Sequence, residues 1–299
     1  MVEFTEEYKE KIAKMYGEKG KNWFENIDKI IKKYEDLFNL TNIKVLENIS
    51  INAVLSAKSD QYGDVIIKIG TPGKTSMDEI RYMNMFKIKN MVKCYYYNLE
   101  DRVMILEKVL PGYTLEKISN TYERIEVFVN LLNDICSKTT NYLEKFPTYE
   151  DKIKEKIIEV QKIDDTKYNI IGIMNTALKL YEEIKNMNLP KYVLHEDLQH
   201  RNILKSEDGW KIIDPHGVVG EKVFETCQFI REEIYKEEKM NIIINKIAEK
   251  IEVEPELIYK ALYINVAVKL MFYIRSGYAE EYILDNINLC NEILECIKK

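Results

Sequence analysis

The sequence predicts an α+β protein in which a small sheet-rich lobe precedes a larger, mostly helical lobe. Three observations support this fold class. Short β-type runs recur between residues 43 and 107, whereas helical periodicity dominates beyond residue 112. The pair Pro111-Gly112 stands between the two patterns. A length of 299 residues allows one large domain or two lobes, and the change of pattern favours two.

Residues 1–108 are predicted to form the first lobe, which begins with two helices. These helices are expected over 4–16 and 22–38, because apolar residues recur along one face of each. Gly17 and Gly20 are expected to separate them.

The sheet of this lobe is predicted to follow the two helices. Its β-type runs lie at 43–46, 53–55, 64–69, 92–97 and 103–107. A hairpin turn is expected at 60–63. A helix over 76–88 interrupts the strands, with Ser76 as its N-cap and Glu79 as the acidic member of a capping box.

Residues 109–112 are expected to form a hinge, and 113–299 to form the helical lobe. Short β-type runs interrupt its helices at 192–194, 203–204 and 212–213. The most apolar stretch, Ala261–Ile274, contains Asn265 and Lys269. It is therefore predicted to be a core helix and not a membrane span.

Composition and charge limit the class of protein and its partners. Hydrophobic residues make up 46% of the chain and charged residues 31%, as in globular proteins. Residues 1–110 hold 18 basic and 17 acidic residues, and the remainder holds 26 and 33. An acidic second half argues against a nucleic-acid partner and suits a cationic small molecule. Five scattered cysteines and an acidic N-terminus without an apolar signal core predict a cytoplasmic protein with reduced thiols.

The most informative stretch is 194–204, Leu-His-Glu-Asp-Leu-Gln-His-Arg-Asn-Ile-Leu, followed by 211–215, Lys-Ile-Ile-Asp-Pro. It sets Asp197, Asn202 and Asp214 at turns between apolar runs, so these side chains are expected at one rim of a strand-loop-strand unit. The oxygens of Asn202 and Asp214 suit Mg²⁺, which protein carboxylates hold together with substrate phosphates. Asp197 is then left to orient a hydroxyl and accept its proton, as in phosphoryl transfer.

Each residue of this stretch also has a simpler interpretation. Taken singly, such residues are more often turn formers or helix caps, but three at this spacing favour catalysis. His195 is expected to support the catalytic loop by hydrogen-bonding backbone. His200 and His216 form no metal-ligand pattern with cysteines, and solvated or supporting roles are expected for both.

A second group of residues lies in the predicted first lobe. Lys68 is flanked by isoleucines, so its ammonium is expected to emerge toward a cleft. Glu79 is its expected ion-pair partner, with Asp78 as the rival. A lysine held by a glutamate is directed at nucleotide phosphates, whereas an ordinary surface pair would contribute little.

These residues resemble the kinase-like antibiotic phosphotransferases, and more closely the streptomycin-type (aminoglycoside/hydroxyurea) kinases. The resemblance covers most of the chain, at 17–23, the Lys68 strand, 106–115, 195–204 and 213–220. It implies a two-lobed, protein-kinase-like fold with a small antiparallel sheet. It further implies that ATP or GTP lies in the cleft between the lobes, accompanied by Mg²⁺.

The resemblance also implies a role for each matching residue. Asp197 would be the catalytic base, and Asn202 and Asp214 would be the Mg²⁺ ligands. Lys68 would hold the inner phosphates with Glu79 as its partner. The nucleotide base would meet the backbone around Glu107 and Val109.

Two segments depart from the family pattern. Segment 48–53 lacks the glycines of a phosphate-binding flap, so Ser50 and Asn52 are expected to bind phosphate through hydroxyl, amide or backbone N–H groups. Glu196 and Arg201 fill loop positions where the family often has glycine. They place bulk and charge beside the transfer site, which bears on the identity of the acceptor.

The sequence thus predicts a Mg²⁺-dependent kinase that phosphorylates a hydroxyl of an aminoglycoside-like antibiotic and confers resistance. The acceptor is expected to be a cationic or polyhydroxy compound, and the protein a monomer or weak dimer without a nucleic-acid or membrane partner. Acceptor contacts are expected from the late helices, at Glu225, Glu232, Glu233, Tyr273 and Tyr278. The alternatives are a kinase of a metabolic sugar or amino alcohol and a non-catalytic nucleotide-binding protein. A protein kinase is disfavoured, because helical-looking residues 221–236 follow Asp214 closely and leave no room for a long activation segment.

Overall fold

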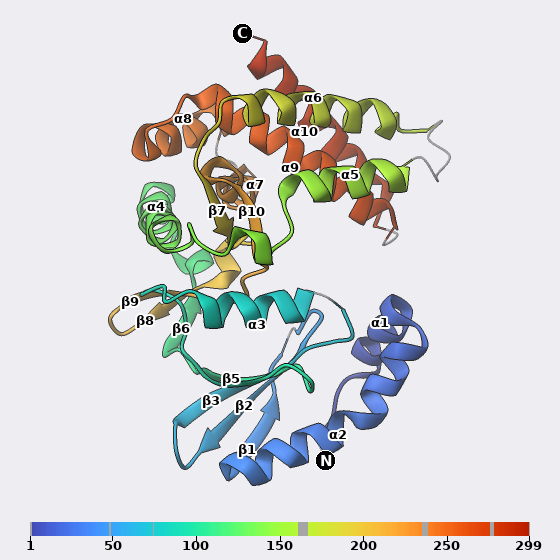
Figure 1. Cartoon of the computed structure of the whole chain (residues 1–299), viewed down its shortest axis with the longest axis vertical. Helices are drawn as coiled ribbons and strands as arrows, with labels where there is room; N and C mark the ends of the chain where they lie inside the picture. Colours follow the sequence, from blue (N-terminus) through green and yellow to red (C-terminus); the bar gives the residue numbers. More distant parts are fainter. Residues whose placement is uncertain are drawn as a thin grey trace. The chain divides into compact units, whose positions relative to one another are not determined.

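The chain folds into two compact units, which we call the sheet unit and the helical unit. The computed structural model describes residues 2–47, 49–73, 75–160, 167–234, 239–275 and 278–298 (Figure 1). The sheet unit comprises Met1–Thr114 and Ile203–His216. The helical unit comprises Leu115–Asn202 and Gly217–Lys299.

The sheet unit is built around a five-stranded antiparallel sheet with strand order β1-β2-β3-β5-β4. Its strands are β1 Leu40–Val45, β2 Ala53–Ser59, β3 Gly63–Ile69, β4 Cys94–Asn98 and β5 Val103–Glu107. Its helices are α1 Glu6–Tyr16, α2 Glu18–Phe38 and α3 Thr75–Met85. The predicted antiparallel sheet, its hairpin at 60–63 and the extra N-terminal helices are confirmed.

The two faces of this sheet have different partners. Alternate residues such as Leu55, Ile67 and Ile105 point to one face and join a core with the apolar stripe of α2. The intervening residue Lys68 points to the opposite face and contacts Glu79 of α3. Figure 1 shows α3 and α2 on opposite sides of this sheet. The alternation of β3 therefore buries isoleucines under α2 and delivers one lysine to α3.

Two local predictions in this unit are wrong. Gly20 does not separate the helices but lies inside α2, where it is buried against α1. Ser76 lies inside α3, and its hydroxyl donates to the carbonyl oxygens of Thr71 and Gly73 at 3.2 and 3.3 Å. Glu79 binds Lys68 instead of closing a capping box. Contacts with distant residues decide both cases.

A second, three-stranded sheet corrects the predicted boundary. It pairs β6 Pro111–Thr114 with β8 Ile203–Ser206, which pairs with β9 Gly209–Ile212. The hinge expected at 109–112 is therefore partly a strand, and residues 203–216 belong with the first part of the chain. Local sequence patterns miss this pairing because the two partners lie far apart in the chain.

The predicted strand-loop-strand unit is likewise divided. Its first strand, β7 Lys191–Leu194, pairs with β10 Val218–Glu221 in a two-stranded sheet of the helical unit. Its other two strands are β8 and β9 of the sheet unit. The helix expected over 221–236 begins only at Thr226, and residues 235–238 lie outside the described part of the chain.

The helical unit packs around one central helix, α9. Its helices are α4 Thr121–Lys138, α5 Tyr149–Val160, α6 Ile170–Asn186, α7 Thr226–Ile234, α8 Met240–Ile251, α9 Pro255–Arg275 and α10 Glu280–Ile297. Short 3₁₀ turns are η1 Leu115–Lys117, η2 Leu143–Lys145, η3 His200–Asn202 and η4 Lys222–Glu225. Helix α9 contacts α5, α6, α7, α8 and α10. It is long and apolar enough to span a membrane, but 72% of its apolar window is buried, which is the pattern of a core helix.

Replacing Gly20 by alanine is expected to destabilise the sheet unit. An alanine Cβ would lie 2.6 Å from the carbonyl oxygen of Ile12 in α1. Helix propensity alone would favour alanine by about 1 kcal/mol, whereas such a backbone clash costs about 1–3 kcal/mol. Urea denaturation should therefore show a net loss of stability for Gly20→Ala. The exposed neighbour Lys19→Ala is the control, and a Gly20→Ala protein at least as stable as wild type would refute the close contact.

Candidate active site

Three charged side chains meet on the α3 face of the large sheet. Lys68 of β3 places its Nζ 2.6 Å from Oε1 of Glu79 and 2.8 Å from Oδ1 of Asp214. The lysine and glutamate side chains are only 4% and 5% exposed. Asp78 forms an ion pair with Arg81 instead. The predicted pairing of Lys68 with Glu79 is therefore confirmed, and the rival is excluded.

Burial and charge act in opposite directions on this group. Burial by itself would lower the pKa of Lys68, but the carboxylates of Asp214 and Glu79 raise it above its usual value. Burial raises the pKa of Glu79 to about 7, against the opposing effect of Lys68. The lysine is thus a fixed, protonated cation, which is the form that binds phosphate oxygens.

Asp214 is the accessible member of the group. It follows β9, and its side chain is 42% exposed although Lys68 beside it is buried. Its backbone has φ of 62°, a conformation that is uncommon for residues other than glycine and that often marks functional positions. The turn directs the carboxylate to Lys68.

Asp197 of the helical unit is surrounded by hydrogen-bond donors. Oδ2 accepts from the side-chain amides of Gln199 at 2.9 Å and Asn202 at 3.0 Å. Oδ1 accepts from the amide of Gln228 at 3.2 Å and lies 3.9 Å from Nζ of Lys269. These donors fix the orientation of both carboxylate oxygens.

Sequence reasoning missed three of these contacts. Gln228 lies on α7 and Lys269 on α9, far from the loop in sequence. Gln199 lies two residues from Asp197, but a glutamine in a polar turn carries no distinctive signal. Of these three residues, only Lys269 carries a signal in the sequence, because a lysine within an apolar core helix requires a polar partner.

Buried groups of the helical unit hold the backbone of the loop at 195–197. Glu196 has φ of 72°, which explains physically why glycine suits its position. Its backbone N–H donates to both carboxylate oxygens of Glu225 at 2.9 and 3.2 Å, and its side chain pairs with Lys152 at 2.8 Å. His195, which is fully buried, accepts from the backbone N–H of Asp197 through Nδ1 at 3.2 Å. The predicted contact between His195 and backbone is therefore confirmed.

Two glutamates expected to bind the acceptor are internal instead. Glu225 is buried beneath the loop, and burial raises its pKa to about 8. Glu233 lies 2.5 Å from Arg124 and from Nε2 of His200. Burial pushes its pKa upward, but these two partners lower it to about 2. The predicted acceptor role of Glu225 and Glu233 is therefore wrong, because helical periodicity does not reveal what a buried carboxylate binds. The solvated role considered for His200 is wrong as well.

The other predicted acceptor residues differ in exposure. Glu232 is half-buried on α7. Tyr273 is buried, and its hydroxyl accepts from Arg231 at 2.9 Å. Tyr278 is exposed, and its ring lies 5.0 Å from that of Tyr273. The structure brings these two tyrosines together, and their contact with an acceptor stays a prediction.

The predicted nucleotide residues of the sheet unit occupy loops and strand ends. Oδ1 of Asn52 accepts from the backbone N–H of Thr71 at 3.2 Å, whereas Ser50 is exposed. Glu107 ends β5, and its carboxylate accepts from the backbone N–H of Lys93 at 3.0 Å. Val109 is buried. Their roles toward a nucleotide stay predictions.

The residues predicted to bind Mg²⁺ have suitable chemistry. Across the described residues, no three His, Cys, Asp or Glu side chains gather into a metal site. Asn202 donates from Nδ2 to the backbone oxygen and Oδ2 of Asp197, which leaves its amide oxygen as a possible ligand. Asp214 presents an accessible carboxylate. Amide and carboxylate oxygens are each among the ligands that Mg²⁺ takes together with phosphates and water.

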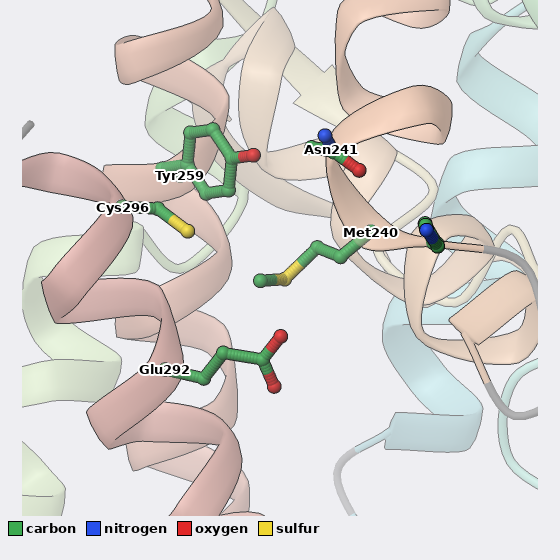
Figure 2. Close-up of a pocket in the computed structure, with 6 residues that line it drawn as sticks. Met240, Asn241, Tyr259, Glu292 and Cys296 are labelled. Atoms are coloured by element: carbon green, nitrogen blue, oxygen red, sulfur yellow. The ribbon is translucent and has the colours of Figure 1, made fainter.

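A hollow of about 430 Å³ lies elsewhere in the helical unit. Figure 2 shows Tyr259, Cys296 and Glu292 on one side of it and Met240 and Asn241 on the other. None of the residues predicted for catalysis lines this hollow. This hollow is therefore not the candidate active site.

The chain was compared with models of protein families and with curated protein sequences. The sequence model of the family described as aminoglycoside/hydroxyurea antibiotic resistance kinase matches residues 44–266. A search of curated protein sequences found no match.

Solved structures share the fold at low sequence identity. Choline kinase LicA from Streptococcus pneumoniae has a TM-score of 0.68 at 16% identity, over 91% of this chain and 99% of that one. A choline/ethanolamine kinase family protein from Mesorhizobium loti has a TM-score of 0.67 at 11% identity, over 85% and 88%. Aminoglycoside phosphotransferase APH(4)-Ia has a TM-score of 0.63 at 12% identity, over 90% and 97%. The predicted protein-kinase-like fold is thereby confirmed.

Removing Lys68 should show whether its ion pair is buried in solution. Lys68→Met leaves the carboxyl of Glu79 without its cation, which should reduce the free energy of unfolding by about 3 kcal/mol. The double variant Lys68→Met/Glu79→Gln should recover part of this loss. Lys58→Met, on the exposed side of neighbouring β2, is the control in the same denaturation series. A loss no larger than that of the control would indicate an ordinary surface pair.

Glu225 should make stability depend on pH. Its ordinary pKa of 4.5 applies to the unfolded chain, and its folded pKa is about 8. Between these values the folded protein keeps a proton that the unfolded chain loses, so stability falls as pH rises, by about 1.4 kcal/mol per pH unit from this residue. Glu225→Gln should lack this component and gain stability relative to wild type between about pH 5 and about pH 8.

Urea denaturation at about pH 5 and at about pH 8 measures the difference in stability between wild type and Glu225→Gln. Glu232→Gln on the adjacent helix is the control. Parallel pH profiles for wild type and Glu225→Gln would mean that the carboxyl of Glu225 does not retain its proton.

Proposed function

Because the chain belongs to the aminoglycoside/hydroxyurea antibiotic resistance kinase family, and is thus a small-molecule phosphotransferase acting on hydroxyl groups, we propose a specific reaction for it. The protein transfers the γ-phosphate of ATP, or of GTP, to a hydroxyl of an aminoglycoside-type acceptor such as streptomycin. The modified acceptor no longer acts as an antibiotic, so the reaction confers resistance. We place the reaction in the cytoplasm.

The environment of Asp197 is the observation that carries this proposal. Its carboxylate is fixed by the amides of Gln199, Asn202 and Gln228, yet its side chain remains 17% exposed. A carboxylate held in one orientation and open to solvent is suited to receive the proton of a bound hydroxyl. No purely structural role requires such a group to remain accessible.

The reaction follows from this arrangement. The acceptor hydroxyl donates a hydrogen bond to Asp197, and its oxygen attacks the γ-phosphorus as the bond to the β-phosphate oxygen breaks. The hydroxyl proton passes to Asp197, and the products are the phosphorylated acceptor and the nucleoside diphosphate. Lys68 binds and neutralises the phosphates, while Glu79 holds its ammonium in place.

Mg²⁺ belongs to this proposal through two residues. Asn202 and Asp214 would hold it, and when bound it neutralises phosphate charge during transfer. Nucleotide positioning is proposed for Ser50, Asn52 and the backbone from Glu107 to Val109.

Two alternatives use the same residues. A kinase of a metabolic sugar or amino alcohol would differ only in its acceptor. A non-catalytic nucleotide-binding protein is disfavoured, because three side-chain amides hold Asp197 and two carboxylates hold Lys68. A site that had lost catalysis would not require several donors to hold an accessible carboxylate.

Asp197→Asn should greatly reduce transfer but retain nucleotide binding. Asparagine keeps the shape of the side chain but cannot accept the proton, so the rate should fall by about 10²-fold or more. Purified protein with Mg²⁺ and ATP or GTP would be screened against aminoglycosides, sugars and amino alcohols for phosphate transfer. Thermal shift with nucleotide measures binding independently of turnover.

Gln199→Leu is an informative companion variant, because it removes one donor to Asp197 and leaves the carboxylate in place. It should reduce the rate less than Asp197→Asn. Full activity in Asp197→Asn would exclude Asp197 as the base. Transfer confined to a sugar or amino alcohol would retain the reaction and replace the acceptor.

A further inference from the structure

We infer that Arg231 is a positioning residue for Asp197, and that it acts by fixing the orientation of the Gln228 amide that lies between them. The consequence of this inference for catalysis rests on the proposed function, in which Asp197 accepts the proton of the acceptor hydroxyl. The contacts themselves lie entirely within the helical unit.

Arg231 is a buried cation held between three helices. Only 4% of the residue is exposed, and it lies on α7 three positions after Gln228. Its Nη1 donates to Oε1 of Gln228 at 3.2 Å. Its Nη2 donates to the hydroxyl of Tyr273 on α9 at 2.9 Å and to Oδ1 of Asn286 on α10 at 3.0 Å. These neutral acceptors fix the plane and the position of the guanidinium.

Gln228 joins this guanidinium to the candidate base. The two ends of its amide have nearly the same shape but opposite hydrogen-bonding character. A guanidinium can only donate, so it binds the amide oxygen, and the NH₂ group is left to donate to Oδ1 of Asp197 at 3.2 Å. An ionised carboxylate can only accept, so both partners select the same orientation of the amide.

The far side of Arg231 is fixed in the same way. Asn286 is fully buried, and its Nδ2 donates to the backbone oxygen of Tyr282 at 2.8 Å. This contact leaves Oδ1 of Asn286 to accept from Arg231. A directed series of hydrogen bonds therefore runs from α10 through Arg231 and Gln228 to Asp197.

The Gln228 contact differs from the other contacts of Asp197. Oδ2 is held by Gln199 and Asn202, which belong to the same loop as Asp197. Gln228 instead joins Oδ1 to helix α7. Nζ of Lys269 lies 3.9 Å from that oxygen, beyond hydrogen-bond distance, and burial lowers the pKa of this lysine. The series of hydrogen bonds thus sets the direction of the carboxylate against the helical core, and a displacement of the base by about 1 Å can cost about 10²-fold in rate.

Steady-state kinetics of the full chain with ATP, Mg²⁺ and streptomycin test this inference. Arg231→Met should lower kcat about tenfold or more and change the KM values by less than about twofold, because the base is misdirected while substrate binding is retained. In a Gln228→Leu background, Arg231→Met should cause no further loss, since the contact through which it acts is already gone. Arg275→Met, which removes an exposed guanidinium from α9, is the control and should leave kcat unchanged.

Gln228→Glu separates positioning from folding. It keeps the size of the side chain and gives Arg231 a carboxylate partner, so the protein should unfold at the same temperature as wild type or higher. An ionised glutamate has no N–H to donate to Asp197 and repels its carboxylate, so kcat should fall about tenfold or more. Should Arg231→Met fail to fold, Arg231→Lys replaces it with the same expected difference between kcat and KM, because an ammonium lacks the two arms of the guanidinium.

The orientation of Gln228 can also be measured without turnover. In a ¹H–¹⁵N spectrum of protein labelled on glutamine, the side-chain NH₂ signal that disappears in Gln228→Leu belongs to this residue. Its exchange with solvent should be slow in wild type and about tenfold faster or more in Arg231→Met. Arg275→Met should leave the exchange rate unchanged.

A kcat of Arg231→Met equal to that of the control, losses that add in the double variant, full activity of Gln228→Glu or an unchanged exchange rate of the Gln228 amide would each overturn the inference. Absence of phosphate transfer by wild type, together with the expected change in amide exchange, would defeat the proposed function and leave the positioning of Asp197 intact.

Discussion

The site of this protein depends on how the buried carboxyl group of one glutamate holds an irregular loop. Glu225 accepts the backbone N–H of Glu196, which lies in a left-handed conformation directly before Asp197. Without that acceptor, the part-buried N–H would lose its hydrogen-bond partner and the turn would lose its support. The orientation of Asp197, and with it every contact of its carboxylate, therefore depends on a residue that follows it by nearly thirty positions.

The two units position charge by different means. In the sheet unit, strand alternation places Lys68 on the face opposite the isoleucine core, where Glu79 and Asp214 hold it by ionic contact. In the helical unit, amides from a loop and a helix hold Asp197. Ion pairs suit a lysine that must remain cationic, whereas neutral amides orient a carboxylate without neutralising it. The two units therefore hold their charged side chains by different kinds of contact.

Two residues near Asp197, Glu196 and Lys269, carry long polar side chains where the local structure would favour a glycine or an apolar residue. Glu196 has a backbone conformation that would favour glycine, and its side chain pairs with Lys152. Lys269 places its Nζ 3.9 Å from Oδ1 of the candidate base, and burial lowers the pKa of this lysine. Both residues change the charge near Asp197 without removing any donor to its carboxylate.

The sequence by itself determined the antiparallel sheet, the N-terminal and core helices and the polar loop around Asp197, because local periodicity and spacing encode them. It left Asp78 and Glu79 as rival partners of Lys68, and the fold decided between them. Tertiary structure alone decided that β6 pairs with β8, that Gly20 lies inside a helix and that Glu225 and Glu233 are internal. It also revealed Gln228 and Lys269 beside Asp197. Each of these features joins residues far apart in the chain, and a local pattern shows only that a side chain is polar or apolar, never what it contacts.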